Sequence, residues 1–160
     1  MTLPGGRAVF ALVFVVALGA VLAALVTQHV FDMQPCPWCV LQRLIFVLVA
    51  SFAALGWLWR SATGRWVGAL GISTLCALGA TAALWQHFVA AASSSCNLTL
   101  ADRILSGAGL DALWPQVFAA TASCADAKVD LLGVPYEFYS LALFVLLDLA
   151  ALSLVWRRTA

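Results

Sequence analysis

Two cysteines separated by two residues are the first feature of this chain that could carry chemistry. They lie in the segment Cys36-Pro37-Trp38-Cys39, and Arg43 follows four residues after the second cysteine. Cysteines at this spacing can form an exchangeable disulfide. If a helix begins here, its positive N-terminal dipole and Arg43, one turn on, would both stabilise a thiolate at Cys39. We interpret the segment as redox-active. The alternatives are a structural disulfide and half of a zinc site, which would need two further ligands.

The elements around this segment are too apolar for a water-soluble domain. The chain has 160 residues, of which 64% are hydrophobic and 9% are charged. Soluble proteins carry roughly 25% charged residues. Four apolar runs have about the length that crosses a bilayer, and they cover about residues 8–26, 40–59, 66–88 and 136–156. We predict a single membrane domain over residues 1–160, an all-α bundle of four transmembrane helices. The net charge of +1 argues against nucleic-acid binding.

Basic residues predict the orientation of this bundle. Five of the eight lie in the N-terminal segment, in the link between the second and third runs, and in the C-terminal segment: Arg7, Arg60, Arg65, Arg157 and Arg158. Because cytoplasmic segments carry an excess of Lys and Arg, we expect both termini to be cytoplasmic. Two loops, about residues 27–39 and 89–135, would then face outward.

The outer loops contain four of the five cysteines. Cys96 and Cys124 are 28 positions apart in the long loop, which by itself indicates a disulfide that staples the loop. Beside a second pair in the neighbouring loop, however, they could instead exchange through mixed disulfides. The fifth cysteine, Cys76, lies in the middle of the third run, and we interpret it as a small apolar residue.

A stretch of the long loop, residues 110–118, allows two interpretations. Trp114, Val117 and Phe118 would form the apolar face of a short helix lying flat on the membrane surface. The same residues would equally suit a packed loop with one aromatic anchor.

These motifs together resemble the bacterial inner-membrane disulfide-bond formation protein B (DsbB) family, over nearly the whole chain. The matching positions are Gln28-His29-Val30, Cys36-Pro37-Trp38-Cys39 with Arg43, His87, Cys96 with Cys124, Pro115-Gln116-Val117-Phe118, and Leu132-Gly133 before Pro135. The resemblance implies a thiol:quinone oxidoreductase of the bacterial inner membrane. It would re-oxidise a periplasmic thioredoxin-fold oxidase of the DsbA type and pass the electrons to the membrane quinone pool, as ubiquinone or menaquinone.

The resemblance also implies roles for the four outer cysteines. Cys96 resembles the residue that forms the mixed disulfide with the partner oxidase. Cys124 resembles the residue that relays electrons to Cys36, and Cys39 resembles the thiolate next to the quinone. The implied catalytic residues are therefore Cys36, Cys39, Cys96 and Cys124.

Two further residues resemble those that bind the quinone. Arg43 resembles a family arginine required for quinone use, and His87 resembles a histidine placed near the quinone ring. Both are predicted at the outer membrane edge, where they could donate to the quinone oxygens. No metal is implied.

Other functions stay open on sequence alone. His29 and His87 both lie at the outer ends of runs and could be the axial ligands of a haem in an electron-transfer protein. A membrane protein with two inert disulfides is a second alternative. An enzyme like vitamin K epoxide reductase is a third, although the Cys-x-x-Cys segment at the start of the second run argues against it. No role is assigned to Asp148, inside the fourth run.

Overall fold

Four long helices dominate the computed structural model, which describes residues 4–92, 99–127 and 129–156. They are α1 (Pro4–Val30), α2 (Pro37–Leu58), α3 (Ala62–Phe88) and α7 (Tyr136–Trp156). Within the described ranges, these four are the helices long and apolar enough to cross a membrane. The predicted class, an all-α bundle of four membrane-spanning helices, is confirmed. Helices α1 and α3 begin about a turn before the apolar runs seen in the sequence.

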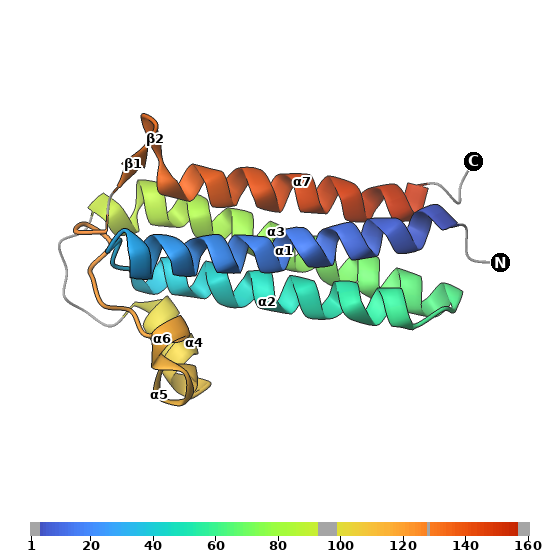
Figure 1. The fold of residues 1–160 in the computed structure, drawn as a ribbon, viewed down its shortest axis with the longest axis horizontal. Helices are drawn as coiled ribbons and strands as arrows, with labels where there is room; N and C mark the ends of the chain where they lie inside the picture. Colours follow the sequence, from blue (N-terminus) through green and yellow to red (C-terminus); the bar gives the residue numbers. More distant parts are fainter. Residues whose placement is uncertain (1–3, 93–98, 128, 157–160) are drawn as a thin grey trace.

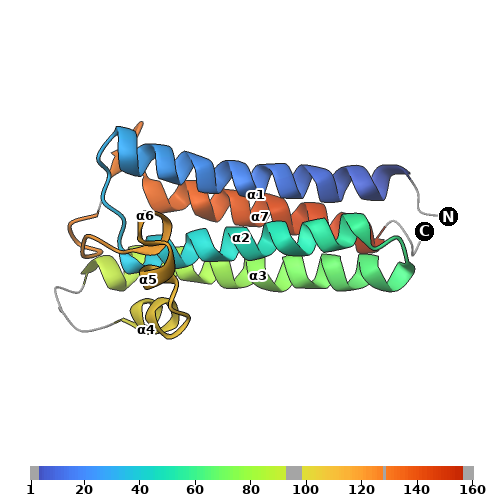
Figure 2. The same cartoon turned by 60° about the horizontal axis from the view of Figure 1, so that its bottom comes forward.

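The helices alternate in direction, so the bundle has two distinct ends (Figures 1 and 2). The start of α1, the α2–α3 turn and the end of α7 share one end. The Cys36–Cys39 segment at the start of α2 and the long loop share the other, which we call the cysteine end. Helix α3 packs against both α2 and α7, and α1 packs mainly against α2.

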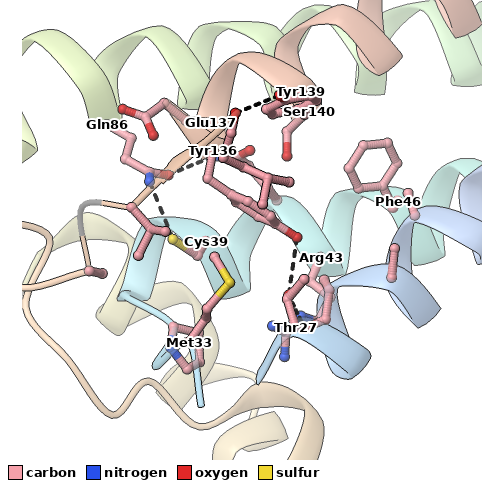
Figure 3. Close-up of a pocket in the computed structure, with 18 of the residues that line it drawn as sticks. Thr27, Met33, Cys39, Arg43, Phe46, Gln86, Tyr136, Glu137, Tyr139 and Ser140 are labelled. Atoms are coloured by element: carbon pink, nitrogen blue, oxygen red, sulfur yellow. Dashed lines mark hydrogen bonds between the residues drawn. The ribbon is translucent and has the colours of Figure 1, made fainter. Parts of the chain in front are cut away.

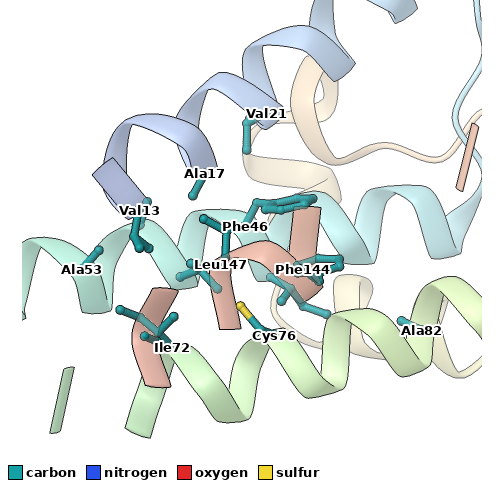
Figure 4. Close-up of a cluster of buried hydrophobic side chains, with 14 of the residues drawn as sticks. Val13, Ala17, Val21, Phe46, Ala53, Ile72, Cys76, Ala82, Phe144 and Leu147 are labelled. Atoms are coloured by element: carbon teal, nitrogen blue, oxygen red, sulfur yellow. The ribbon is translucent and has the colours of Figure 1, made fainter. Parts of the chain in front are cut away.

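Buried hydrophobic side chains from the four long helices fill the middle of the bundle (Figure 4). The rings of Phe46 on α2 and Phe144 on α7 stack with 4.1 Å between their centroids. Gly79 of α3 faces Phe144 so closely that a Cβ at this position would overlap the ring. Small residues let helices approach closely where the lipid offers no hydrophobic driving force for association. Cys76 is 1% exposed in this core, which fits its interpretation as a small apolar residue.

The long loop contains short helices that pack beside α2 at the cysteine end (Figures 1 and 2). After the 3₁₀ helix η1 (Ala90–Ala92), the described part continues with α4 (Leu100–Gly107), α5 (Leu110–Leu113) and α6 (Pro115–Phe118). Helix α4 was not predicted, although Thr99 and Asp102 form a capping box at its start.

Residues 110–118 form two one-turn helices instead of one continuous helix. Pro115 cannot continue a helix and disfavours helical backbone at Trp114, which has φ −137° and ψ 69°. Phe118 is 3% exposed and packs with Val40 of α2. Trp114 is 61% exposed. The stretch is therefore a packed loop, and its aromatic anchor is Phe118.

A two-residue hairpin connects this loop to α7. Strands β1 (Asp130–Leu131) and β2 (Val134–Pro135) pair antiparallel, with Leu131 opposite Val134. The turn residues Leu132 and Gly133 have φ of 54° and 79°, and positive φ at both central residues is the signature of a type I′ turn. The hydroxyl of Tyr139 donates to the Leu131 carbonyl at 2.7 Å, which fixes the hairpin to the first turns of α7.

Packing at Gly79 gives a stability prediction. Gly79→Ala should lower the free energy of unfolding by about 1–3 kcal/mol, because the new methyl group overpacks the Phe144 ring. The matched control is Gly19→Ala on α1, where a Cβ meets nothing within 4 Å. Thermal unfolding of both variants in the same detergent checks this, and equal melting temperatures would contradict it.

Candidate functional site

The first two cysteines lie at the N-terminus of α2. Cys36 is the N-cap residue, and Pro37 occupies the first helical position, where its missing N–H leaves no hydrogen bond unmade. The Cys36 sulfur accepts from the backbone N–H of Cys39 at 3.3 Å. The two Sγ atoms are 2.7 Å apart. The sequence therefore folds this segment so that its two sulfurs are in direct contact.

The long loop brings a third sulfur to the same place. The backbone N–H groups of Thr121 and Ala122 donate to the Pro35 carbonyl at 3.0 and 3.3 Å. The Thr121 hydroxyl donates to Gln34 Oε1 at 2.6 Å. These bonds dock the segment before Cys124 onto the residues before Cys36, and the two thiol groups hydrogen-bond to each other. Cys36, which is fully buried, thus contacts both of the other sulfurs.

Hydrogen bonding changes the pKa values of these thiols in opposite directions. Bonds to Cys124 and Cys39, together with burial, raise the pKa of the Cys36 thiol far above its usual range. The bond from Cys36 lowers the pKa of Cys124, against the opposing effect of its partial burial. Cys36 is therefore the proton donor in its bond to Cys124, and this bond holds the pKa of the Cys124 thiol below its usual range.

Besides its contact with Cys36, the Cys39 sulfur receives a hydrogen bond from a neighbouring helix. Gln86 Nε2 of α3 donates to the Cys39 sulfur at 3.3 Å. Gln86 Oε1 in turn accepts from Gln42 Nε2 of α2 at 2.7 Å. Both glutamines are buried. The amide of Gln42 thereby fixes the orientation of the Gln86 amide, so that its N–H group faces the sulfur (Figure 3).

Arg43 is buried and ties α2 to two other parts of the cysteine end. Its Nη1 donates to Gln28 Oε1 of α1 at 2.8 Å and to the Val117 carbonyl of α6 at 2.7 Å. Its Nε is shielded from solvent and has no hydrogen-bond partner among the described residues. No hydrogen bond joins Arg43 to the Cys39 sulfur among the described residues, whereas Gln86 donates to that sulfur directly. The role expected for Arg43 beside Cys39 stays a prediction.

A cavity of about 300 Å³ lies beside Cys39 and Arg43 (Figure 3). Most of its lining is apolar and comes from α1, α2, α7 and the loop segments next to them. The polar side chains that line it include Gln42, Gln86 and Glu137. Of the described cysteines, Cys39 is the one that lines the cavity. Cys36 lies between Cys39 and Cys124, so Cys124 is the sulfur of these three that is farthest from the cavity along the contacts.

His87 lies behind this cavity rather than in its lining. Its Nδ1 forms a 2.7 Å contact with Glu137 Oε1 of α7. The His87 side chain is 31% exposed, whereas Glu137 is 7% exposed and lines the cavity. His29 is exposed, and its Nε2 lies 3.2 Å from the Gln116 carbonyl. Cys96 falls outside the described residues, so its pairing with Cys124 stays a prediction.

Comparison with known proteins decides the family. Residues 6–154 of this chain match the family described as Disulfide bond formation protein DsbB. The chain belongs to the DsbB family. Two similar relatives carry the same name: Disulfide bond formation protein B of Ralstonia nicotianae is 32% identical over 154 residues, 95% of each chain. Disulfide bond formation protein B 1 of Pseudomonas savastanoi pv. phaseolicola is 34% identical over 140 residues, 83% of this chain and 82% of the relative.

This membership, with the four spanning helices, makes the protein a multi-pass membrane oxidoreductase of disulfide-bond formation. In this DsbB family member, sequence analysis missed the roles of Gln42, Gln86 and Glu137. Their polar side chains within apolar membrane segments were a signal in the sequence, because such side chains are costly there and usually have partners. The same signal applies to Asp148, whose carboxylate accepts from the Ser73 hydroxyl of α3, away from the cavity.

The sulfur cluster predicts how Cys124 titrates in the reduced protein. Cys36→Ala removes the hydrogen bond that favours the Cys124 thiolate, so the pKa of Cys124 should rise and its alkylation at neutral pH should slow. Iodoacetamide labelling against pH, followed on the Cys124 peptide by mass spectrometry, measures the midpoint. Cys76→Ala, in the distant core, should leave the midpoint in place. A midpoint that is unchanged or lowered in Cys36→Ala would overturn the assignment.

Proposed function

We propose that this protein is a thiol:quinone oxidoreductase that re-oxidises a periplasmic dithiol oxidase of the DsbA type. The observation that carries the proposal is the position of Cys36. It contacts Cys124, which comes from the outer loop, and Cys39, which lines an apolar cavity at the level of the membrane helices. Family membership supports the disulfide chemistry, and the contact sequence supports its direction.

The proposed exchange begins at the long loop. A partner thiolate attacks Cys96 in a Cys96–Cys124 disulfide, the bond between Cys96 and Cys124 breaks, and Cys124 leaves as a thiolate. Cys124 then attacks Cys36 in a Cys36–Cys39 disulfide, and Cys39 leaves as a thiolate.

Two further exchanges complete the cycle at the loop. The second partner thiol displaces Cys96 and leaves the partner oxidised. Cys96 then re-forms its bond to Cys124 and releases Cys36. One disulfide has been lost from the Cys36–Cys39 pair, and one has been gained by the partner.

The cavity beside Cys39 fits a quinone. A quinone ring is apolar, as most of the lining is, and its carbonyl oxygens need donors such as the unpaired Arg43 Nε. A bound quinone would accept two electrons and two protons and leave the Cys36–Cys39 pair as a disulfide. Arg43 would hold it from α2. His87 does not line the cavity, so it would affect the quinone indirectly, through its contact with the Glu137 carboxyl group.

The surrounding residues would prepare Cys39 and move protons. Gln86, oriented by Gln42, donates to the Cys39 sulfur and stabilises its thiolate form. Glu137 lines the cavity and contacts His87, which is partly exposed. A proton could therefore pass between the aqueous surface and the cavity through His87 Nδ1 and Glu137 Oε1.

The proposal places the bundle in the bacterial inner membrane, with both termini in the cytoplasm. The start of α1, the end of α7 and the α2–α3 turn lie at one end of the bundle (Figure 1). That end carries Arg7, Arg60 and Arg65, which favours the cytoplasmic side. The cysteine end then faces the periplasm, an oxidising compartment in which disulfides persist.

The haem alternative has less support from the arrangement of the histidines. His29 and His87 would both have to reach one ligand, yet neither is among the residues that line the cavity within the described ranges. The alternative of inert disulfides does not account for a sulfur that contacts two others.

Oxidation of a reduced DsbA-type protein by the purified protein, with ubiquinone or menaquinone supplied, tests the proposal. Turnover should require quinone and should be lost when Cys36, Cys39, Cys96 or Cys124 is changed to serine. Cys76→Ser is the matched control and should retain turnover, because Cys76 lies in the core of the bundle. Normal quinone reduction by Cys39→Ser would refute the mechanism.

Arg43 and Gln86 should affect different kinetic constants. Arg43→Ala removes a quinone donor and should raise the KM for quinone about tenfold, a typical effect of losing one charge-assisted hydrogen bond. The KM for the partner protein should change little. Gln86→Leu removes the donor to the Cys39 sulfur and should lower kcat with the quinone KM unchanged. Steady-state kinetics with each substrate varied in turn checks both, and an unchanged quinone KM in Arg43→Ala would count against its role.

A further inference from the structure

A second group of buried cationic atoms lies at the end of the bundle opposite the cysteines. A small cavity of about 20 Å³ there is lined by residues from the start of α1, the end of α2, the α2–α3 turn and the start of α3. Its charged lining residues are Arg7, Arg60 and Arg65, and Trp57 and Trp59 lie beside them. These arginines take no part in the chemistry proposed for the cysteine end.

Two of the arginines have nitrogen atoms without partners. Arg7 Nε and Arg65 Nη2 are shielded from solvent and have no hydrogen-bond partner among the described residues. The Arg7 guanidinium lies 5.0 Å from the centre of the Trp57 ring, a cation–π contact that supplies no acceptor to the shielded Nε. A buried donor without an acceptor is costly, and a charged one more so. Both nitrogens therefore lack an acceptor that a ligand could supply.

Among the described residues, no acidic side chain lies at this end. Six of the chain's seven acidic residues lie in the loops of the cysteine end or, as Glu137, in the first turn of α7 at that end. The seventh, Asp148, lies within α7 and accepts from Ser73. In the described part of the chain, the one ion pair is that of His87 with Glu137. Three arginines thus line one small cavity, and no carboxylate of the described residues pairs with them, which favours an anionic ligand.

We propose that this cavity binds the phosphate group of an anionic membrane phospholipid. Guanidinium groups match phosphate oxygens in charge and in their planar arrangement of donors. The cavity has room for about one oxygen atom, so the phosphate would lie at its mouth and direct one oxygen inward. The ligand is independent of the quinone and of the sulfur chemistry.

The depth of the site favours a lipid over a free anion. The site lies where α2 ends and α3 begins, so its arginines are at the level of the lipid headgroups if these helices span the membrane. Trp57 and Trp59 are 41% and 51% exposed, and tryptophan concentrates at this interface. Leu55, one turn before Trp59, is 51% exposed and offers apolar surface to an acyl chain.

Thermal unfolding of the full-length protein in detergent tests the site. The probes are dioleoylphosphatidylglycerol, dioleoylphosphatidylcholine and inorganic phosphate, each titrated separately. Phosphatidylglycerol should raise the melting temperature at concentrations where the other two have little effect. The double variant Arg7→Gln with Arg65→Gln should need about tenfold more phosphatidylglycerol for the same shift, since it loses charge-assisted hydrogen bonds.

Two further variants make the result decisive. Arg103→Gln, at an exposed position of α4 at the cysteine end, removes an arginine charge elsewhere and should behave as the parent protein does. Arg65→Lys keeps the charge but loses the planar fork, so it should fall between the parent and the double variant, and it stands in if the double variant does not fold. Equal shifts with both lipids, an undiminished shift in the arginine variants, or an equal shift with inorganic phosphate would overturn the proposal.

Discussion

The contact of one buried thiol with two other sulfurs is the interaction on which the cysteine end depends. Cys36 lies between Cys39, three residues on in the chain, and Cys124, which comes from the far end of the long loop. The first contact is fixed by the N-terminus of α2. The second is fixed by backbone hydrogen bonds to the Pro35 carbonyl. Backbone geometry thus places the two segments that carry these sulfurs next to each other.

A buried polar network extends this order into the membrane part of the protein. Arg43 bonds to Gln28 of α1 and to the Val117 carbonyl of α6, while Gln42 bonds to Gln86 of α3. Unpaired polar groups are costly in such surroundings, so each bond ties helices together as well as placing a side chain. The unpaired Arg43 Nε and the cavity beside it stand apart from this rule. A buried donor without a partner, next to a cavity, points to a ligand that would accept its hydrogen bond.

Sequence analysis reached the spanning helices and the sulfur chemistry because both depend on local signals. Apolar length predicts a span, and the Cys-x-x-Cys spacing predicts exchange. It could not reach contacts that depend on how helices are rotated against one another. Gln86 is 47 residues from Cys39, and nothing local to either indicates that α3 turns this amide toward the sulfur. The contact of His87 with Glu137 depends on the meeting of α3 and α7 in the same way. Helix α4 is different, since the capping residues Thr99 and Asp102 could have predicted it.

The most direct test of the account asks whether Cys36 and Cys124 form a disulfide with each other. A Cys39→Ser, Cys96→Ser double variant removes the disulfide partners proposed for Cys36 and Cys124, and Cys76 stays buried in the core. After mild oxidation, peptide mapping by mass spectrometry under non-reducing conditions identifies the linked cysteines. We expect a Cys36–Cys124 link within one chain as the main product. Reduced Cys36 and Cys124, or links mainly between chains, would contradict it.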